Sequence, residues 1–118
     1  MFIGENWFLL ECKPEIIDES HPVEKLDAAI LTKYVLDPIL GISDLKSDDN
    51  VEFISGIHSL EKMEGKIKGG EFKIGFFLHP VTVDEIKSVA DDNLTMPPKS
   101  TWIEPKLRSG LTIYNINE

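Results

Sequence analysis

The sequence predicts an α+β fold, an α/β-like sandwich in which a mixed sheet of about four to five strands carries three helices. Three observations support this prediction. Apolar residues recur at helical spacing in three segments, short apolar runs typical of strands lie between them, and the chain opens with a hairpin signal. The predicted order is β-β-α-β-α-β-α-β, in a single domain that spans residues 1–118.

The first predicted element is a hairpin. Phe2–Ile3 and Trp7–Cys12 are apolar, and Gly4–Asn6 between them contains two residue types that tolerate the positive φ of a tight turn. The first strand is very short. We therefore expect it to be the middle of a longer sheet element, and the chain to be a C-terminal fragment of a longer protein.

The clearest helix follows a polar connection at Lys13–Pro22. Asp27 is its predicted N-cap, Pro38 should kink it or begin a new turn, and Gly41 should end it. The apolar residues that recur at helical spacing in this segment are Ile30, Leu31, Tyr34, Val35, Ile39 and Leu40.

Two strands and a helix are predicted next. Val51–Ile54 is predicted to be a short strand, and Ser59 can cap a helix at Leu60–Lys68 that has Leu60, Met63 and Ile67 on one face. Phe72–Leu78 is almost wholly apolar, which is typical of a central strand covered on both faces.

A third helix and a last strand complete the fold. Thr82 and Glu85 have the spacing of a capping box for a helix at Val83–Asp92, which should turn Val83, Ile86, Val89 and Ala90 inward. Leu111–Ile116 alternates apolar and polar residues, as a strand with one buried face does.

Composition excludes several kinds of function. The 118 residues are 42% hydrophobic and carry a net charge of −9, which disfavours binding to nucleic acid or to an anionic membrane through the bulk surface. Cys12 is the only cysteine, and the three histidines lie on separate elements, so we expect no disulfide, no metal and no cofactor in this chain. No signal peptide and no membrane-spanning run is visible, which favours a cytoplasmic protein.

The basic residues of the C-terminal part cluster between Met96 and Gly110, a segment called here the basic island. Between Met96 and Gly110, Lys99, Lys106 and Arg108 outweigh Glu104 by two charges, so the rest of the chain carries −11. Segregation of charge is what a local anion site needs, and an arginine can form a bidentate fork on a carboxylate or phosphate.

The other residues between Met96 and Gly110 are compatible with either a ligand-binding loop or a structural connection. Ser100 and Thr101 supply donors, and Pro97, Pro98 and Pro105 fix φ, which lowers the entropy lost when a ligand is bound. The alternative is that the basic residues pair with neighbouring carboxylates and that Trp102 fills the core.

A second candidate lies between the strand at Val51–Ile54 and the helix after it. Gly56 would allow a ligand close to the backbone, His58 adds a donor, and helix N-termini attract anions. The plainer interpretation is an ordinary turn with Ser59 as the cap. His79 follows an apolar strand, where a solvated or capping histidine is the commoner arrangement.

Four stretches together resemble a known family: HPVEKLDAAILTKYVLDPILGI, VEFISGIHSLEKME, FFLHPVTVDEIKSVADDN and MPPKSTWIEPKLRSGL. They are similar, in order and over essentially the whole chain, to the C-terminal part of domain-of-unknown-function family 1015, a family of prokaryotic proteins. The last stretch is the most distinctive. One departure is Ser55-Gly56-Ile57-His58-Ser59, where the family pattern is Gly-Gly-x-Arg-Gly, which weakens any phosphate contact there.

The resemblance implies a larger protein. Family members have an N-terminal part with an Asp-Gly-His-His-Arg type motif, similar to ParB and sulfiredoxin-like nucleotide-binding domains, and some ParB-like relatives are small-molecule kinases that phosphorylate free serine. That half would be the main partner of this chain, with a second subunit as another.

Two functions remain open at this stage. In the first, a non-catalytic module binds an anionic small ligand, such as a nucleotide or phosphorylated metabolite, through Lys99, Ser100, Thr101, Lys106 and Arg108 with Gly56 and His58. In the second, a structural and interaction module uses its Pro-rich loop and Trp102 to dock the N-terminal half or a second subunit. A self-contained enzyme is disfavoured, because no nucleophile–base pair is apparent.

Overall fold

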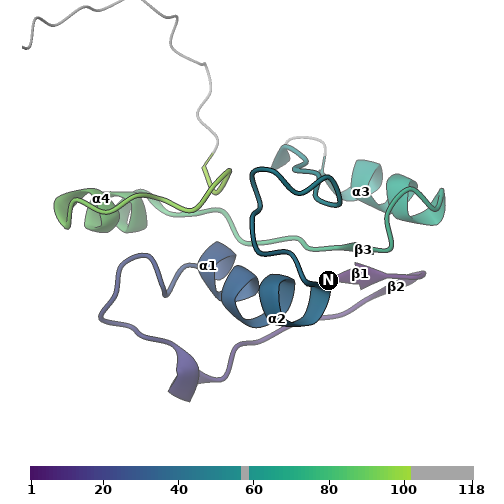
Figure 1. Cartoon of the computed structure of the whole chain (residues 1–118). Helices are drawn as coiled ribbons and strands as arrows, with labels where there is room; N and C mark the ends of the chain where they lie inside the picture. Colours follow the sequence, from purple (N-terminus) through teal and green to yellow (C-terminus); the bar gives the residue numbers. More distant parts are fainter. Residues whose placement is uncertain (57–58, 102–118) are drawn as a thin grey trace, which may run out of the picture.

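The computed structural model describes residues 1–56 and 59–101 and gives an α+β arrangement (Figure 1). Its sheet has three short strands, β1 (Phe2–Ile3), β2 (Asn6–Trp7) and β3 (Ile74–Gly75). Both neighbours pair antiparallel with β1, so the strand order is β2-β1-β3. The predicted opening hairpin is present, but its second strand is Asn6–Trp7 instead of Trp7–Cys12. Gly4 has the positive φ, 61°, that its turn requires.

The predicted architecture is wrong in the size and type of its sheet and in its element order. The described sheet is wholly antiparallel and has three strands instead of four to five. Residues Val51–Ile54 form a loop, in which the amide of Val51 closes a turn onto the carbonyl of Asp48. The other predicted strand, Leu111–Ile116, lies outside the described residues.

The strand predicted at Phe72–Leu78 is also shorter than expected, and it lies at an edge of the sheet. Only Ile74 and Gly75 pair with β1, because β1 itself offers two residues to the ladder. Beyond Gly75 the chain continues through Phe77 and Leu78, which are 48% and 37% exposed. An apolar run therefore does not form a central strand unless partner strands of the same length exist.

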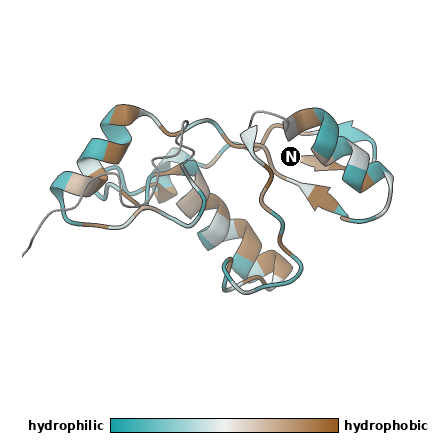
Figure 2. Cartoon of the chain, turned by 90° about the horizontal axis from the view of Figure 1, so that it is seen from above, coloured by the Kyte–Doolittle hydropathy of each residue, from teal (hydrophilic) through white to brown (hydrophobic). Residues whose placement is uncertain are grey.

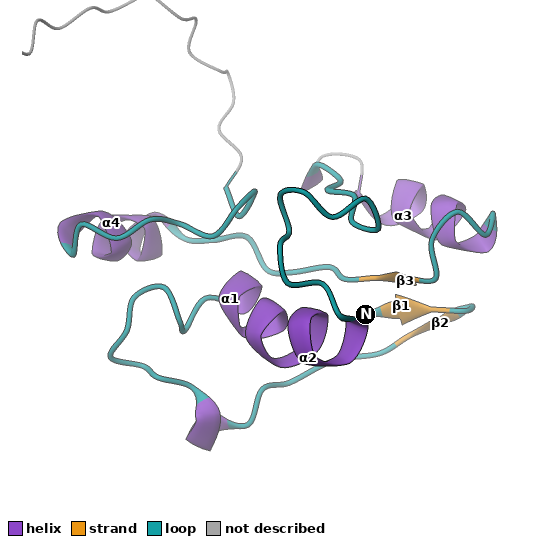
Figure 3. Cartoon of the chain, in the orientation of Figure 1, coloured by secondary structure: helices purple, strands orange, loops and turns teal. Residues whose placement is uncertain are grey.

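One helical segment, continuous in Figure 3, runs from residue 27 to residue 40, and its middle turn is π-helical. It consists of α1 (Asp27–Leu31), a π-helical turn η2 (Thr32–Leu36) and α2 (Asp37–Leu40). The amide of Asp37 donates to the carbonyl of Thr32, five residues back. Since Pro38 has no amide proton for the carbonyl four residues before it, we attribute the wider turn to this proline.

Of the two predicted ends of this helical segment, one is correct and one is wrong. Gly41 ends it in the left-handed conformation, with φ 72°, as predicted. At the other end Leu26 occupies the N-cap position and Asp27 lies inside the helix, so the prediction that Asp27 caps it is wrong.

The main cluster of buried side chains lies between the sheet and α3 (Ser59–Lys68). Phe2 from β1 packs with Met63 and Ile67 of α3, and the partly buried Ile54 and Phe72 pack against them. Helix and sheet approach closely at Gly75, where a Cβ atom would lie 2.5 Å from the sulfur of Met63. Of the residues predicted for one face of this helix, Met63 and Ile67 are buried as expected, whereas Leu60 is 46% exposed.

The last helix of the described part, α4 (Val83–Asp91), begins with the predicted capping box. The amide of Glu85 donates to the Thr82 hydroxyl at 3.2 Å, and the Glu85 carboxylate accepts from the Thr82 amide at 2.7 Å. The predicted inner face is only partly correct. Val89 is buried, but Val83, Ile86 and Ala90 are exposed.

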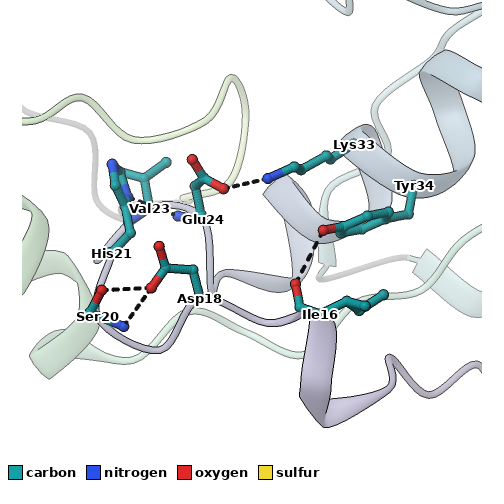
Figure 4. Close-up of polar contacts among 8 residues, drawn as sticks. All are labelled: Ile16, Asp18, Ser20, His21, Val23, Glu24, Lys33 and Tyr34. Atoms are coloured by element: carbon teal, nitrogen blue, oxygen red, sulfur yellow. Dashed lines mark hydrogen bonds and ion pairs between the residues drawn. The ribbon is translucent and has the colours of Figure 1, made fainter.

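Polar contacts attach the connection before α1 to the helical segment (Figure 4). The Tyr34 hydroxyl donates to the carbonyl of Ile16, which ends the short helix η1 (Pro14–Ile16), and Lys33 pairs with Glu24. The imidazole Nδ1 of His21 accepts from the amides of Val23 and Glu24 at 3.2 Å. These contacts set the position of residues 16–24 beside η2.

Much of the apolar surface remains exposed in the described residues. Figure 2 shows hydrophobic residues along connecting segments as well as on helices. Five large hydrophobic side chains are buried: Phe2, Leu26, Met63, Ile67 and Val89. Trp7, Phe8, Leu9 and Leu10 are exposed in succession, Leu9 to 82%. No helix in residues 1–56 and 59–101 has both the length and the apolar character needed to cross a bilayer.

Candidate functional site

The described start of the basic island is a tight turn. Both the amide and the hydroxyl of Ser100 donate to the carbonyl of Pro97, at 3.3 and 2.7 Å. Lys99 has φ 58°, in the left-handed region. The hydroxyl of Ser100 therefore stabilises the turn, and its contact with a ligand stays a prediction.

This turn borders a hollow of about 410 Å³, called here the Lys99 hollow. Its wall combines the turn with the segment that follows α2. The lining residues are Leu45, Lys46, Asp48, Val51, Phe53, Pro98 and Lys99. Two lysines that are 53 positions apart in the sequence thus lie on one hollow.

Local hydrogen bonds fix the loop that carries Lys46. The Asp44 carboxylate accepts from the Ser47 hydroxyl at 2.7 Å and from the Lys46 amide at 2.9 Å. These bonds, with a smaller contribution from the Lys46 charge, hold the pKa of Asp44 below its ordinary value. Asp48 accepts from the amide and side chain of Asn50 at 2.8 Å.

The charge of the Lys99 hollow is positive. Lys46 and Lys99 line it together with one acidic residue, Asp48. Within residues 1–56 and 59–101, neither lysine has a carboxylate within ion-pair distance, although the charge of Lys46 acts on the carboxylate of Asp44. Other described lysines, such as Lys62 and Lys87, also lack an ion pair, so the feature that distinguishes Lys46 and Lys99 is their position on one hollow.

A second hollow, called here the Ala29 hollow, lies against the first and measures about 610 Å³. The two hollows share Leu45, Lys46 and Pro98. The other lining residues of the Ala29 hollow are Val23, Ala29, Thr32, Lys33, Thr95, Met96 and Pro97. Lys33 is neutralised by Glu24, so Lys46 supplies the unpaired charge at this end as well.

The structure brings together only part of the predicted site. Lys99, Pro97 and Pro98 line the hollows, Ser100 closes the turn, and Thr101 is exposed. Gly56 is exposed and lines neither hollow. The remaining candidates lie outside the described residues: His58, Trp102, Pro105, Lys106 and Arg108.

Lys46 was not among the residues that the sequence singled out. It lies in a polar, acidic stretch, Ser43–Asn50, which has the composition of a solvated loop. The one hint is that Lys46 is the only basic residue in that stretch. Nothing in the spacing connects it with Lys99, because the link between them is made by tertiary contact.

Comparison of the chain with protein-family models, with curated proteins and with solved structures found no match. Within the described part of the chain, no group of three or more histidine, cysteine, aspartate or glutamate side chains is arranged to hold a metal ion. Any functional proposal must therefore stand on the geometry of the hollows and on their charge.

Proposed function

We propose that this chain is a non-catalytic module that binds a small anionic ligand through its basic loop, with Lys46 and Lys99 as the cationic residues of the described part. One observation carries the proposal: Lys46 and Lys99, neither of which has an ion pair within the described residues, line the same hollow. In a chain with a net charge of −9, two lysines beside a hollow that has one acidic lining residue, Asp48, favour a local anion site.

The resemblance to domain-of-unknown-function family 1015 extends this proposal. In that setting the ligand is a nucleotide or phosphorylated metabolite, with a link to serine metabolism, and the chain acts beside a nucleotide-binding N-terminal half. Lys106 and Arg108 would then add to the positive charge at the loop. The chain supplies binding groups in this proposal, and the chemistry belongs to the other half.

Titration with inorganic phosphate and with phosphoserine, followed by calorimetry or by amide chemical shifts, tests the proposal. Lys46→Ala and Lys99→Ala should each weaken binding by about tenfold, since a charge-assisted hydrogen bond contributes on the order of 1.5 kcal/mol. Lys62→Ala is the matched control, because Lys62 is exposed on α3 and lines neither hollow.

The outcomes separate clearly. If Lys62→Ala weakens binding as much as Lys99→Ala does, the effect is a general loss of charge and the site proposal is wrong. If phosphate and phosphoserine do not shift any resonance of residues 44–53 or 97–101, no anion site exists at the hollow.

The exposed apolar surface favours a second candidate function, a docking module. Trp7, Phe8, Leu9 and Leu10 are consecutive exposed apolar side chains, and exposed apolar surface often marks a site of protein contact. The partner would be a second copy or the N-terminal half that the family resemblance implies. The Pro-rich loop and Trp102 would contribute to docking as well.

Sedimentation of the chain at several concentrations tests self-association through this run. Leu9→Asp should shift the chain to monomer, while Val83→Asp, at an equally exposed apolar position on α4, should not. A chain that is monomeric at every concentration excludes the second copy as the partner. Co-purification of the chain with the implied N-terminal half then tests that half as the partner.

A further inference from the structure

The two hollows differ in polarity although they adjoin. Lys46 lines both hollows, and both have apolar walls, with Val51 and Phe53 in the Lys99 hollow and Val23, Ala29 and Met96 in the Ala29 hollow. The Ala29 hollow presents the larger apolar surface, and its other lysine, Lys33, is paired with Glu24. The depression is therefore more apolar at its Ala29 end, whereas Lys99 and Asp48 line only the other end.

From this polarity we infer that the ligand is a small anion that carries an apolar body, with its charged group between Lys46 and Lys99 and its body in the Ala29 hollow. The inference rests on the proposed anion site and adds the chemical class of the ligand. An anionic group would complement the charges of Lys46 and Lys99, whereas an uncharged apolar molecule would leave both lysines without a partner in the ligand.

The size of the hollows agrees with this ligand class. Each measures within the range of about 300–1,000 Å³ found for small-molecule sites. An inorganic anion would occupy the Lys99 hollow alone and leave water against the aliphatic side chains of the other. An aromatic or aliphatic body would displace that water and tighten binding through removal of apolar surface from solvent.

One other occupant must be distinguished, the indole of Trp102. Trp102 follows Thr101, the last described residue, and both hollows are lined by residues a few positions earlier in the chain. If that side chain fills the Ala29 hollow, no room remains for the body of a ligand.

The experiment compares three probes on the full chain: inorganic phosphate, phenyl phosphate and phenol. Phenyl phosphate should bind at least about tenfold more tightly than inorganic phosphate, given the apolar area of a phenyl ring. Phenol should bind more weakly than phenyl phosphate by a similar factor. Lys99→Ala should weaken both phosphates and leave phenol unchanged.

A matched pair of neutral substitutions locates the apolar end. Ala29→Gln places a longer polar side chain in the Ala29 hollow, and Ala90→Gln does the same at an exposed position of α4 that lines neither hollow. Ala29→Gln should remove the advantage of phenyl phosphate and keep phosphate binding, while Ala90→Gln should change neither. Met96→Gln, in a loop, repeats the test without a change in the helix.

The fluorescence of Trp102 tests the competing occupant. Trp7→Phe leaves Trp102 as the only tryptophan of the chain. If acrylamide fails to quench Trp102 in that variant, and if Ala29→Gln but not Ala90→Gln restores quenching, the indole fills the hollow and the inference is wrong.

The two levels of the proposal fail in different ways. Equal affinities for phosphate and phenyl phosphate would overturn the inference and leave the anion site intact. If the unchanged chain does not bind phosphate, or if neither Lys46→Ala nor Lys99→Ala changes the affinity for phosphate, both the anion site and the inference are wrong.

Discussion

The unit formed by α3 and the sheet contrasts with the helical segment at residues 27–40. The first unit buries Phe2, Met63 and Ile67 against each other. The second has no buried residue in any of its three helical parts, and it borders both hollows through its own side chains or the loop that follows it. The difference teaches that one region of the described chain closes a core, whereas the helical segment keeps all of its side chains at least partly accessible to solvent.

The strongest test of this contrast compares two large apolar residues. Phe2→Ala should lower the free energy of unfolding by about 3–5 kcal/mol, because the ring is fully buried in the cluster. Ile39→Ala, at a side chain that is 70% exposed, should change it by less than about 0.5 kcal/mol. Urea titration followed by circular dichroism measures both. Similar losses in the two variants would mean that the contrast in burial is not one of stability.

Glycines provide a second test, within the packed unit itself. Gly75→Ala should lower the free energy of unfolding by about 1–3 kcal/mol, because the new methyl would meet the side chains of Met63 and Ile67. Gly65→Ala, in the middle of α3 with open space around it, should raise stability by about 0.5–1 kcal/mol. Thermal melting of both variants gives the comparison. A neutral Gly75→Ala would show that helix and sheet separate easily.

The smallest expected effect concerns acid. The hydrogen bond from Lys68, and next the one from the Trp7 indole, hold the pKa of Glu64 below its ordinary value of 4.5. Because the folded state binds this proton less readily than the unfolded chain, the contribution of Glu64 to stability is present above pH 4.5 and is lost as the pH falls through the folded pKa.

A substitution isolates this contribution. Glu64→Gln should flatten the dependence of stability on pH below 4.5, and Glu61→Gln on the same helix should not, since Glu61 has no hydrogen bond or ion pair with the described residues. Stability measured at a series of acidic pH values decides between them. The effect should also shrink at high salt, because the pair is solvent-exposed.

The parts of the fold that sequence predicted well are those that depend on neighbours along the chain. The capping box of Thr82 and Glu85 and the turn at Gly4 each need a few consecutive residues, so the sequence contains all the information. The strand at Phe72–Leu78 needed a partner of equal length, and β1 offers two residues. An apolar pattern cannot state the length of a partner that lies 70 positions away.

The candidate site divides in the same way. Lys99 was found because charge can be counted locally, and the described structure places it on a hollow. Lys46 was missed because its relation to Lys99 arises only when the loop after α2 meets the turn at Pro97–Ser100. The ligand contact of Ser100 stays a prediction, and the sequence did not reveal that its hydroxyl donates to the carbonyl of Pro97.

The left-handed backbone of Lys99 has a consequence for selection. Glycine adopts that conformation without strain, whereas a lysine there carries a steric penalty of about 1 kcal/mol. Lys99→Gly should therefore make the chain more stable while it weakens anion binding, and Lys99→Asn should lie between. A screen for thermal tolerance alone should replace the lysine at this position, whereas a screen that also requires anion binding should retain it.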